Sequence, residues 1–239
     1  MKQVIFSTLF IKKKNPVHAR KDISQDMSGY INEWLQSMTE NMVNAVIFHD
    51  GLDEDFIASH SNDYVSFHKV PPISNNACDA RWIVYRNAIE EYKSDYVFAT
   101  DISDVVMGGN PFHADSPLKS GILYTGDESN RYKHPWIQKR NEDLKEILPE
   151  VYNHIKENPE NKILNPGIIG GCYETMKEYF SCMADLVERG GPIEKTVDMS
   201  YHNYVVRNHF DGRYEHGEPV NSKFGKYQKN RKDVWFIHK

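Results

Sequence analysis

Short apolar runs and amphipathic segments alternate through the first half of the chain. Runs rich in β-branched and aromatic residues predict four strands, at residues 4–10, 45–49, 64–70 and 96–99. Apolar positions with helical spacing predict three helices between them, over residues 27–42, 53–59 and 79–92. This alternation predicts an α/β fold with a mostly parallel central sheet and helices on both of its faces.

The second half of the chain is less regular. Its pattern predicts strands at residues 121–126, 220–224 and 234–237, and helices over residues 142–155, 173–188 and 199–208. Residues 127–138 are polar and predict a long loop. Because we find no repeat, low-complexity tract or linker, we expect one domain over residues 1–239.

Composition narrows the classes of protein that fit. Hydrophobic residues make up 39% of the 239 residues and aromatic residues 12%, which is enough for a packed core. The formal net charge of −5 gives no support for nucleic-acid binding. Basic residues gather at 12–14 and 223–232, which suits a small anionic ligand and equally a solvated surface. The three cysteines form no CxxC pair, so a structural zinc site is not expected. With neither a signal peptide nor an apolar stretch long enough for a membrane span, we expect a cytoplasmic protein.

The stretch YVFATDISDVVMGGNPF, residues 96–112, suggests chemistry. Asp101 and Asp104 follow an apolar run, and a second apolar run and a Gly-Gly-Asn-Pro turn come next. Carboxylates at the end of a buried strand need a partner. A hard divalent cation is the natural one, and it keeps positions open for phosphate oxygens. The alternative is structural: one aspartate could cap the turn and the other could lie in solvent.

Arg81 falls in the middle of the apolar face of the helix over residues 79–92. A guanidinium there needs an anion, which the acidic stretch or a bound diphosphate could supply. The alternative is a packed stem whose head reaches solvent. Arg86 lies on the flank of the same face and is a weaker candidate.

Three later stretches carry further candidates. The glycines of NPGIIGG, residues 165–171, would let the backbone approach a ligand, or would mark a bulged strand beside a helix. Asp198 could cap the following helix, orient a sugar or act as a base. His238 and Lys239 follow an apolar strand, and suit a manganese-like ion and a phosphate unless the tail frays.

Taken together and in order, these stretches resemble a nucleotide-sugar-dependent glycosyltransferase of the GT-A fold. The resemblance rests on TDISDV at 100–105, NPGIIGG at 165–171, DMSYHN at 198–203 and IHK at 237–239. It implies that Asp101 and Asp104 are a variant DxD motif, with two intervening residues instead of one. It also implies that these residues and His238 bind Mn²⁺ or Mg²⁺.

The resemblance also implies a donor, an acceptor and their binding residues. The donor would be a nucleoside diphosphate sugar, with uridine diphosphate expected, and the enzyme a hexosyl- or pentosyltransferase acting on a glycan or another hydroxyl acceptor. Asp198 would lie on the acceptor side and serve as the base if the enzyme inverts. Tyr132 and Trp136 could stack on the acceptor. The expected donor-binding residues are Thr8, Leu9, Arg20, Arg81, Asn165, Gly167, Gly170 and Lys239.

Two other functions compete with this reading. A catalytically inactive sugar- or nucleotide-binding member of the same fold is one, because the spacing of the acids is altered. A metal-dependent phosphohydrolase is the other, but its acidic motif would follow the first strand, and here the acids follow several strands.

Overall fold

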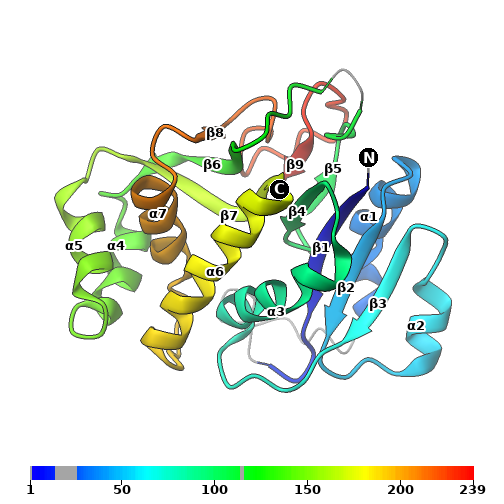
Figure 1. The fold of residues 1–239 in the computed structure, drawn as a ribbon, viewed down its shortest axis with the longest axis horizontal. Helices are drawn as coiled ribbons and strands as arrows, with labels where there is room; N and C mark the ends of the chain where they lie inside the picture. Colours follow the sequence, from blue (N-terminus) through cyan, green and yellow to red (C-terminus); the bar gives the residue numbers. More distant parts are fainter. Residues whose placement is uncertain (1, 14–25, 114–115) are drawn as a thin grey trace.

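The computed structural model describes residues 2–13, 26–113 and 116–239, and its centre is a seven-stranded sheet (Figure 1). The strand order is β3-β2-β1-β4-β7-β6-β8. The bounds are β1 Gln3–Leu9, β2 Ala45–His49, β3 Val65–Lys69, β4 Tyr96–Thr100, β6 Leu123–Arg131, β7 Lys162–Cys172 and β8 Tyr214–His216. Four of the six strand pairings are parallel, and β7 runs antiparallel to both of its neighbours. The predicted mostly parallel sheet is confirmed.

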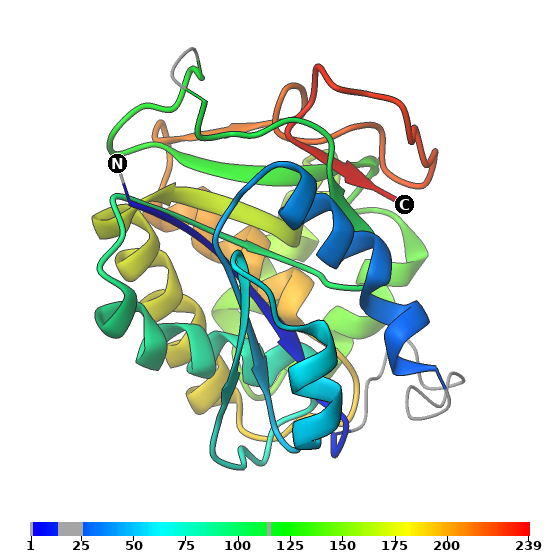
Figure 2. The ribbon, with the colours of Figure 1, turned by 90° about the vertical axis from the view of Figure 1, so that its right-hand side faces the viewer.

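Helices cover both faces of this sheet, as predicted (Figure 2). Alternate residues of a strand point to opposite faces. Phe6 of β1 therefore packs in the cluster that contains α3 (Ala77–Tyr92) and α6 (Tyr173–Gly190). Its neighbour Ile5 packs with α1 (Met27–Glu40) and α2 (Glu54–His60). The remaining helices, α4 (Pro135–Asn141), α5 (Pro149–Glu157) and α7 (Asp198–His209), gather at the end of the molecule far from α2 (Figure 1).

A second, two-stranded sheet joins two distant parts of the chain. β5 (Val105–Met107) pairs antiparallel with β9 (Phe236–His238), and Val105 lies opposite His238. The Lys239 amide also donates to the Asp104 carbonyl, at 2.8 Å. This pairing places the end of the chain beside the acidic stretch that precedes β5.

The prediction of a loop over residues 127–138 is wrong. β6 continues to Arg131, and α4 begins at Pro135. The outer half of β6 alternates between half-buried and exposed positions and pairs irregularly with β7, so its polar sequence does not look like that of a buried strand.

Three other elements also differ from the prediction. The helix expected over residues 142–155 is split into a 3₁₀ turn, Glu142–Leu144, and α5, because Pro149 begins a new helix and cannot continue one. Residues 220–224 form no strand and contribute one isolated bridge, Asn221 to Phe236. The three-residue strand β8 was not predicted. Within the described ranges, no helix has both the length and the apolar character that a membrane span requires.

Gly170 illustrates how closely the sheet is packed. It pairs with Phe98 across β4 and β7, and a β-carbon on it would overlap the Phe98 ring. We expect Gly170→Ala to destabilise the protein by about 1–3 kcal/mol through overpacking. Urea denaturation measures this. Phe98→Leu should make room, so the double variant should lose less stability than the sum of the two single variants. A Gly170→Ala protein as stable as the parent would contradict this packing.

Candidate functional site

A cavity of about 400 Å³ opens where the carboxyl ends of β1 and β4 meet the β5–β9 sheet and the starts of α3 and α7. In sheets of this kind, ligands bind at the carboxyl ends of the strands. Its lining includes Thr8 and Leu9 of β1, Asp101 and His238, and Trp136 of α4.

Asp101, Asp104 and His238 come together on the cavity wall. One potential ligand atom from each lies within 4.8 Å of the other two. The His238 Nε2 atom is 3.8 Å from Asp104 Oδ2. Asp101 follows β4, Asp104 precedes β5, and His238 ends β9, so the β5–β9 pairing builds the group. Two carboxylates and an imidazole at these separations could hold one divalent cation.

Gly167 of β7 backs this group. A β-carbon at this position would lie 2.7 Å from Asp101 Oδ2 and 2.8 Å from His238 Cε1. The Gly167 amide donates to Asn165 Oδ1 at 2.8 Å, and its carbonyl accepts from the Asp101 amide at 2.9 Å. Glycine is therefore required here because β7 passes directly behind the acidic group.

Arg81 connects the acidic group to α7. It is 7% exposed, donates to Asp101 Oδ1, and donates to Asp198 Oδ2 at 2.7 Å. Burial alone would lower the pKa of Arg81, but Asp101 and Asp198 raise it, so the guanidinium stays charged. For Asp101, burial is the dominant cause and raises the pKa of the carboxyl group, and the charge of Arg81 opposes that shift. The alternative of a guanidinium that reaches solvent is excluded.

Asp198 is the first residue of α7 and not its cap, which is Val197. Its Oδ2 accepts from Arg81, and its Oδ1 accepts from the Thr196 hydroxyl at 2.6 Å. Both carboxylate oxygens therefore accept a hydrogen bond. Asp198 is buried, with 6% of the residue exposed, and it lines the cavity.

The other predicted donor-binding residues divide into two sets. Thr8, Leu9 and Asn165 line the cavity. Gly170 is not among the described residues that line it, and its packing on Phe98 explains the absence of a side chain. The Lys239 ammonium forms an ion pair with Glu33 of α1 instead of facing the cavity. Arg20 lies outside the described residues.

No protein-family model and no curated protein matches the chain. The galactosyltransferase LgtC, crystallised with donor and acceptor sugar analogues, matches 99% of this chain and 86% of its own, with a TM-score of 0.55 and 12% identity. An active-site mutant of LgtC matches over the same shares, with a TM-score of 0.56 and 12% identity. The chain has the GT-A fold. At this identity the likeness establishes the fold alone.

Two residues that line this cavity in the GT-A fold, and a third that does not, need a revised description. Glu128 lines it and accepts from Asn165 Nδ2 at 2.9 Å, and burial raises the pKa of its carboxyl group. It was missed because it lies on the part of β6 predicted as a loop. Tyr30 also lines the cavity, but its helical spacing made it look like core. Tyr132 is fully buried and donates to Asn203 Oδ1 at 3.0 Å, so the expectation that it stacks on a sugar is wrong.

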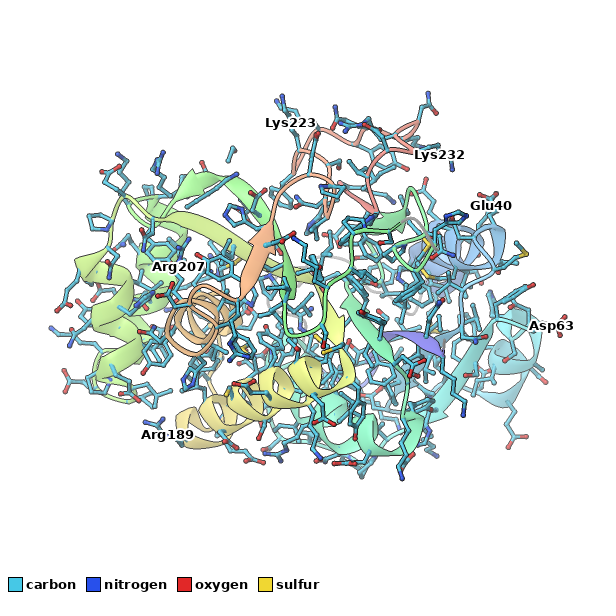
Figure 3. All side chains as sticks on the ribbon, turned by 45° about the horizontal axis from the view of Figure 1, so that its top comes forward. Glu40, Asp63, Arg189, Arg207, Lys223 and Lys232 are labelled. Atoms are coloured by element: carbon cyan, nitrogen blue, oxygen red, sulfur yellow. The ribbon has the colours of Figure 1, made fainter. Side chains whose placement is uncertain are left out.

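The basic segment 223–232 has two kinds of side chain. Lys223 and Lys232 project away from the body of the molecule (Figure 3). Lys229 instead pairs with Glu33, and Arg231 pairs with Glu218 and Asp233. Phe224 is the member of this segment that reaches the cavity, where its ring packs edge-on against His238.

The Arg81 bridge leads to a stability prediction. Arg81→Met would leave the buried Asp198 and the half-buried Asp101 without their shared cation, and we expect a loss of about 3 kcal/mol. Arg86→Met on the same helix is the matched control. Arg86 pairs at the surface with Glu188, and we expect a change of about 1 kcal/mol or less. Urea denaturation of both variants measures the difference, and equal losses would contradict the role of Arg81.

Asp79, two residues before Arg81 in α3, gives a pH prediction. Its Oδ1 has no partner among the described residues, and burial followed by the charge of Asp198 raises its pKa to about 8. The folded state therefore binds more protons than the unfolded state between roughly pH 4 and pH 8, and stability falls as pH rises through this window.

Asp79→Asn mimics the protonated acid and should remove this dependence. Relative to the parent, the variant should gain at least about 1 kcal/mol between pH 6 and pH 9. Denaturant midpoints at the two pH values measure the gain. Asp63→Asn, on the exposed edge labelled in Figure 3, is the control and should show none. A parallel pH profile for Asp79→Asn and the parent would exclude a raised pKa.

Proposed function

We propose that residues 1–239 form a single metal-dependent glycosyltransferase domain. It would transfer a sugar from a nucleoside diphosphate sugar, with uridine diphosphate expected, to a hydroxyl group of a carbohydrate acceptor. The observation that carries the proposal is the meeting of Asp101, Asp104 and His238 on the wall of a ligand-sized cavity in the GT-A fold. The solved neighbour with this fold was crystallised with donor and acceptor sugar analogues.

The chemistry of the three side chains fits a divalent cation. The His238 Nδ1 atom is buried and has no partner among the described residues, so the imidazole lacks a protein acceptor that would hold it for another purpose. Asp101 gives one oxygen to Arg81 and turns the other towards His238 and Gly167. Asp101, Asp104 and His238 would hold Mn²⁺ or Mg²⁺. When bound, the ion supplies positive charge to the diphosphate leaving group.

The protein's own residues would then position the two substrates. Thr8 and Leu9, at the end of β1, are proposed to contact the nucleoside, with Arg20 as a further candidate. Asn165 and Glu128, which are hydrogen-bonded to each other, offer polar groups to the transferred sugar. Lys239 could reach a phosphate only by leaving Glu33, and exposed pairs of this kind are worth only about 1 kcal/mol or less.

Asp198 is proposed to orient the site from the acceptor side. To act as a base it would have to accept the proton of the acceptor hydroxyl. Both of its oxygens already accept hydrogen bonds, from Arg81 and from Thr196, so this role requires one of those bonds to break. We therefore assign Asp198 to holding Arg81, and through it Asp101, in place.

A binding protein without turnover is the second candidate, because the acids have two intervening residues. The turn at residues 101–104 weakens this objection. It brings the carboxylates of Asp101 and Asp104 within 4.8 Å of each other in spite of the longer spacing. The altered spacing therefore does not separate the carboxylate oxygens of Asp101 and Asp104, and this supports the enzyme over the binding protein.

Calorimetry tests the proposed metal site. Mn²⁺ should raise the affinity of the parent for uridine diphosphate by about tenfold or more, which is about 1.4 kcal/mol. Asp104→Ala and His238→Ala should abolish this metal effect because each removes a proposed ligand. Asp211→Ala, at an exposed position, should retain it. If no nucleoside diphosphate binds with Mn²⁺ present, the proposal fails.

Donor hydrolysis separates the two candidates. With Mn²⁺, slow release of the diphosphate from one of a panel of uridine diphosphate sugars is expected of an enzyme and not of a binding protein. Asp104→Ala should reduce this release to the rate without metal. Binding of the donor with no hydrolysis by the parent, and no transfer to any sugar, would favour the binding protein.

A further inference from the structure

The outer half of β6 contributes two polar side chains to the cavity. Alternate residues of a strand point to the same face. Glu128 and Asn130 accordingly line the cavity. Asp127 precedes Glu128 in the strand and points to the other face, where it pairs with Lys162 and His216. The two neighbouring acids of β6 therefore have different surroundings, and only Glu128 is placed where a ligand could reach it.

Glu128 uses one of its two carboxylate oxygens within the described part of the chain. Its Oε1 atom accepts from Asn165 Nδ2 at 2.9 Å, and its Oε2 atom has no partner among the described residues. Burial is the dominant cause that raises the pKa of Glu128, and the hydrogen bond from Asn165 and the charges of His238 and His134 oppose that shift. A carboxylate whose pKa is raised towards neutrality is well suited to accept a proton from a reacting group.

Asn165 fixes the position of Glu128 relative to the proposed metal site. Its Nδ2 atom donates to Glu128, and its Oδ1 atom accepts from the amide of Gly167, which backs that site. Glu128 therefore lies beside the proposed metal site without belonging to it. The base of a direct displacement needs this placement, because the attacking hydroxyl and the leaving group lie on opposite sides of the anomeric carbon.

The other carboxylates that line the cavity already have roles. Asp101 and Asp104 belong to the proposed metal site, and both oxygens of Asp198 accept hydrogen bonds. His134 also lines the cavity, but it is exposed and its Nδ1 atom accepts from the Trp136 amide at 3.3 Å, at the start of α4. Within the described ranges, Glu128 is therefore the lining carboxylate that remains available for a proton.

We propose that Glu128 is the general base of the transfer reaction. Its Oε2 atom would take the proton of the attacking hydroxyl while the oxygen of that hydroxyl forms a bond to the anomeric carbon of the donor. The bond from this carbon to the phosphate oxygen breaks, and its electron pair leaves with the nucleoside diphosphate. The inference rests on the proposed function, and it predicts inversion of configuration because the displacement is direct.

Donor hydrolysis tests the base before the acceptor is known, because water then supplies the attacking hydroxyl. The parent and its variants would be compared with Mn²⁺ and the uridine diphosphate sugar that the parent hydrolyses. Glu128→Gln keeps an oxygen that can accept from Asn165 but loses the basic one, so release of the diphosphate should fall by about 100-fold or more. Glu157→Gln removes the same charge from the exposed end of α5, and this matched control should hydrolyse the donor as the parent does.

Three further measurements separate a base from a residue that only shapes the site. In calorimetry with Mn²⁺, Glu128→Gln should bind uridine diphosphate as tightly as the parent. Formate should partly restore hydrolysis by Glu128→Ala, because it supplies the missing carboxylate, and it should not restore hydrolysis by Asp104→Ala. Proton NMR, recorded before the anomers of the released sugar equilibrate, should show the inverted configuration.

Three results would overturn the assignment of Glu128 and leave the proposed function in place. They are hydrolysis by Glu128→Gln at the rate of the parent, release of the sugar with retained configuration, and an equal loss of hydrolysis and of uridine diphosphate affinity in Glu128→Gln. A parent that releases no diphosphate from any uridine diphosphate sugar, and transfers no sugar, would reject the enzyme and its base together.

Discussion

The ion pairs of Arg81 with Asp101 and Asp198 are the constraint on which the arrangement of the site depends. A buried guanidinium and two carboxylates are stable only when they are paired with one another. The pairing joins the end of β4 to the start of α7, two elements almost a hundred residues apart in the chain. It also fixes which oxygen of Asp101 faces the cavity. The position of the carboxyl end of β4 relative to α7 is therefore set by electrostatics as well as by apolar packing.

Backbone contacts position the remaining residues of the site. The β5–β9 pairing delivers His238 to the side of Asp104, and the close passage of β7 behind Asp101 requires Gly167. Each of these contacts brings together residues more than fifty positions apart in sequence. The candidate metal group is consequently a product of the whole sheet and not of one loop, which favours a fixed geometry over an adaptable one.

The lining of the cavity combines acidic and aromatic side chains. Asp101 and Asp104 lie beside His238, an arrangement that suits a divalent cation. The lining also includes the aromatic side chains of Tyr30, Trp136 and Phe224.

The sequence by itself determined the elements whose pattern is local. The strands β1 to β4 and the helices α1, α3 and α6 could be predicted from periodicity and residue type, because both act over a few neighbouring residues. Residue type also singled out Asp101, Asp104 and His238 as candidate ligands. It failed for the outer half of β6, which is polar, and so it missed Glu128. It also suggested that Tyr132, in the turn after β6, could contact a sugar, whereas this side chain is buried.

Only the tertiary structure decided which groups meet. Arg81 could have met an acid, a ligand or solvent, and Lys239 was expected at a phosphate but lies with Glu33. Gly170 was expected at the ligand but makes room for Phe98. These outcomes depend on contacts between segments that are distant in sequence. The pattern of neighbouring residues predicts local structure, but it does not predict which distant residue a side chain will contact in the folded protein.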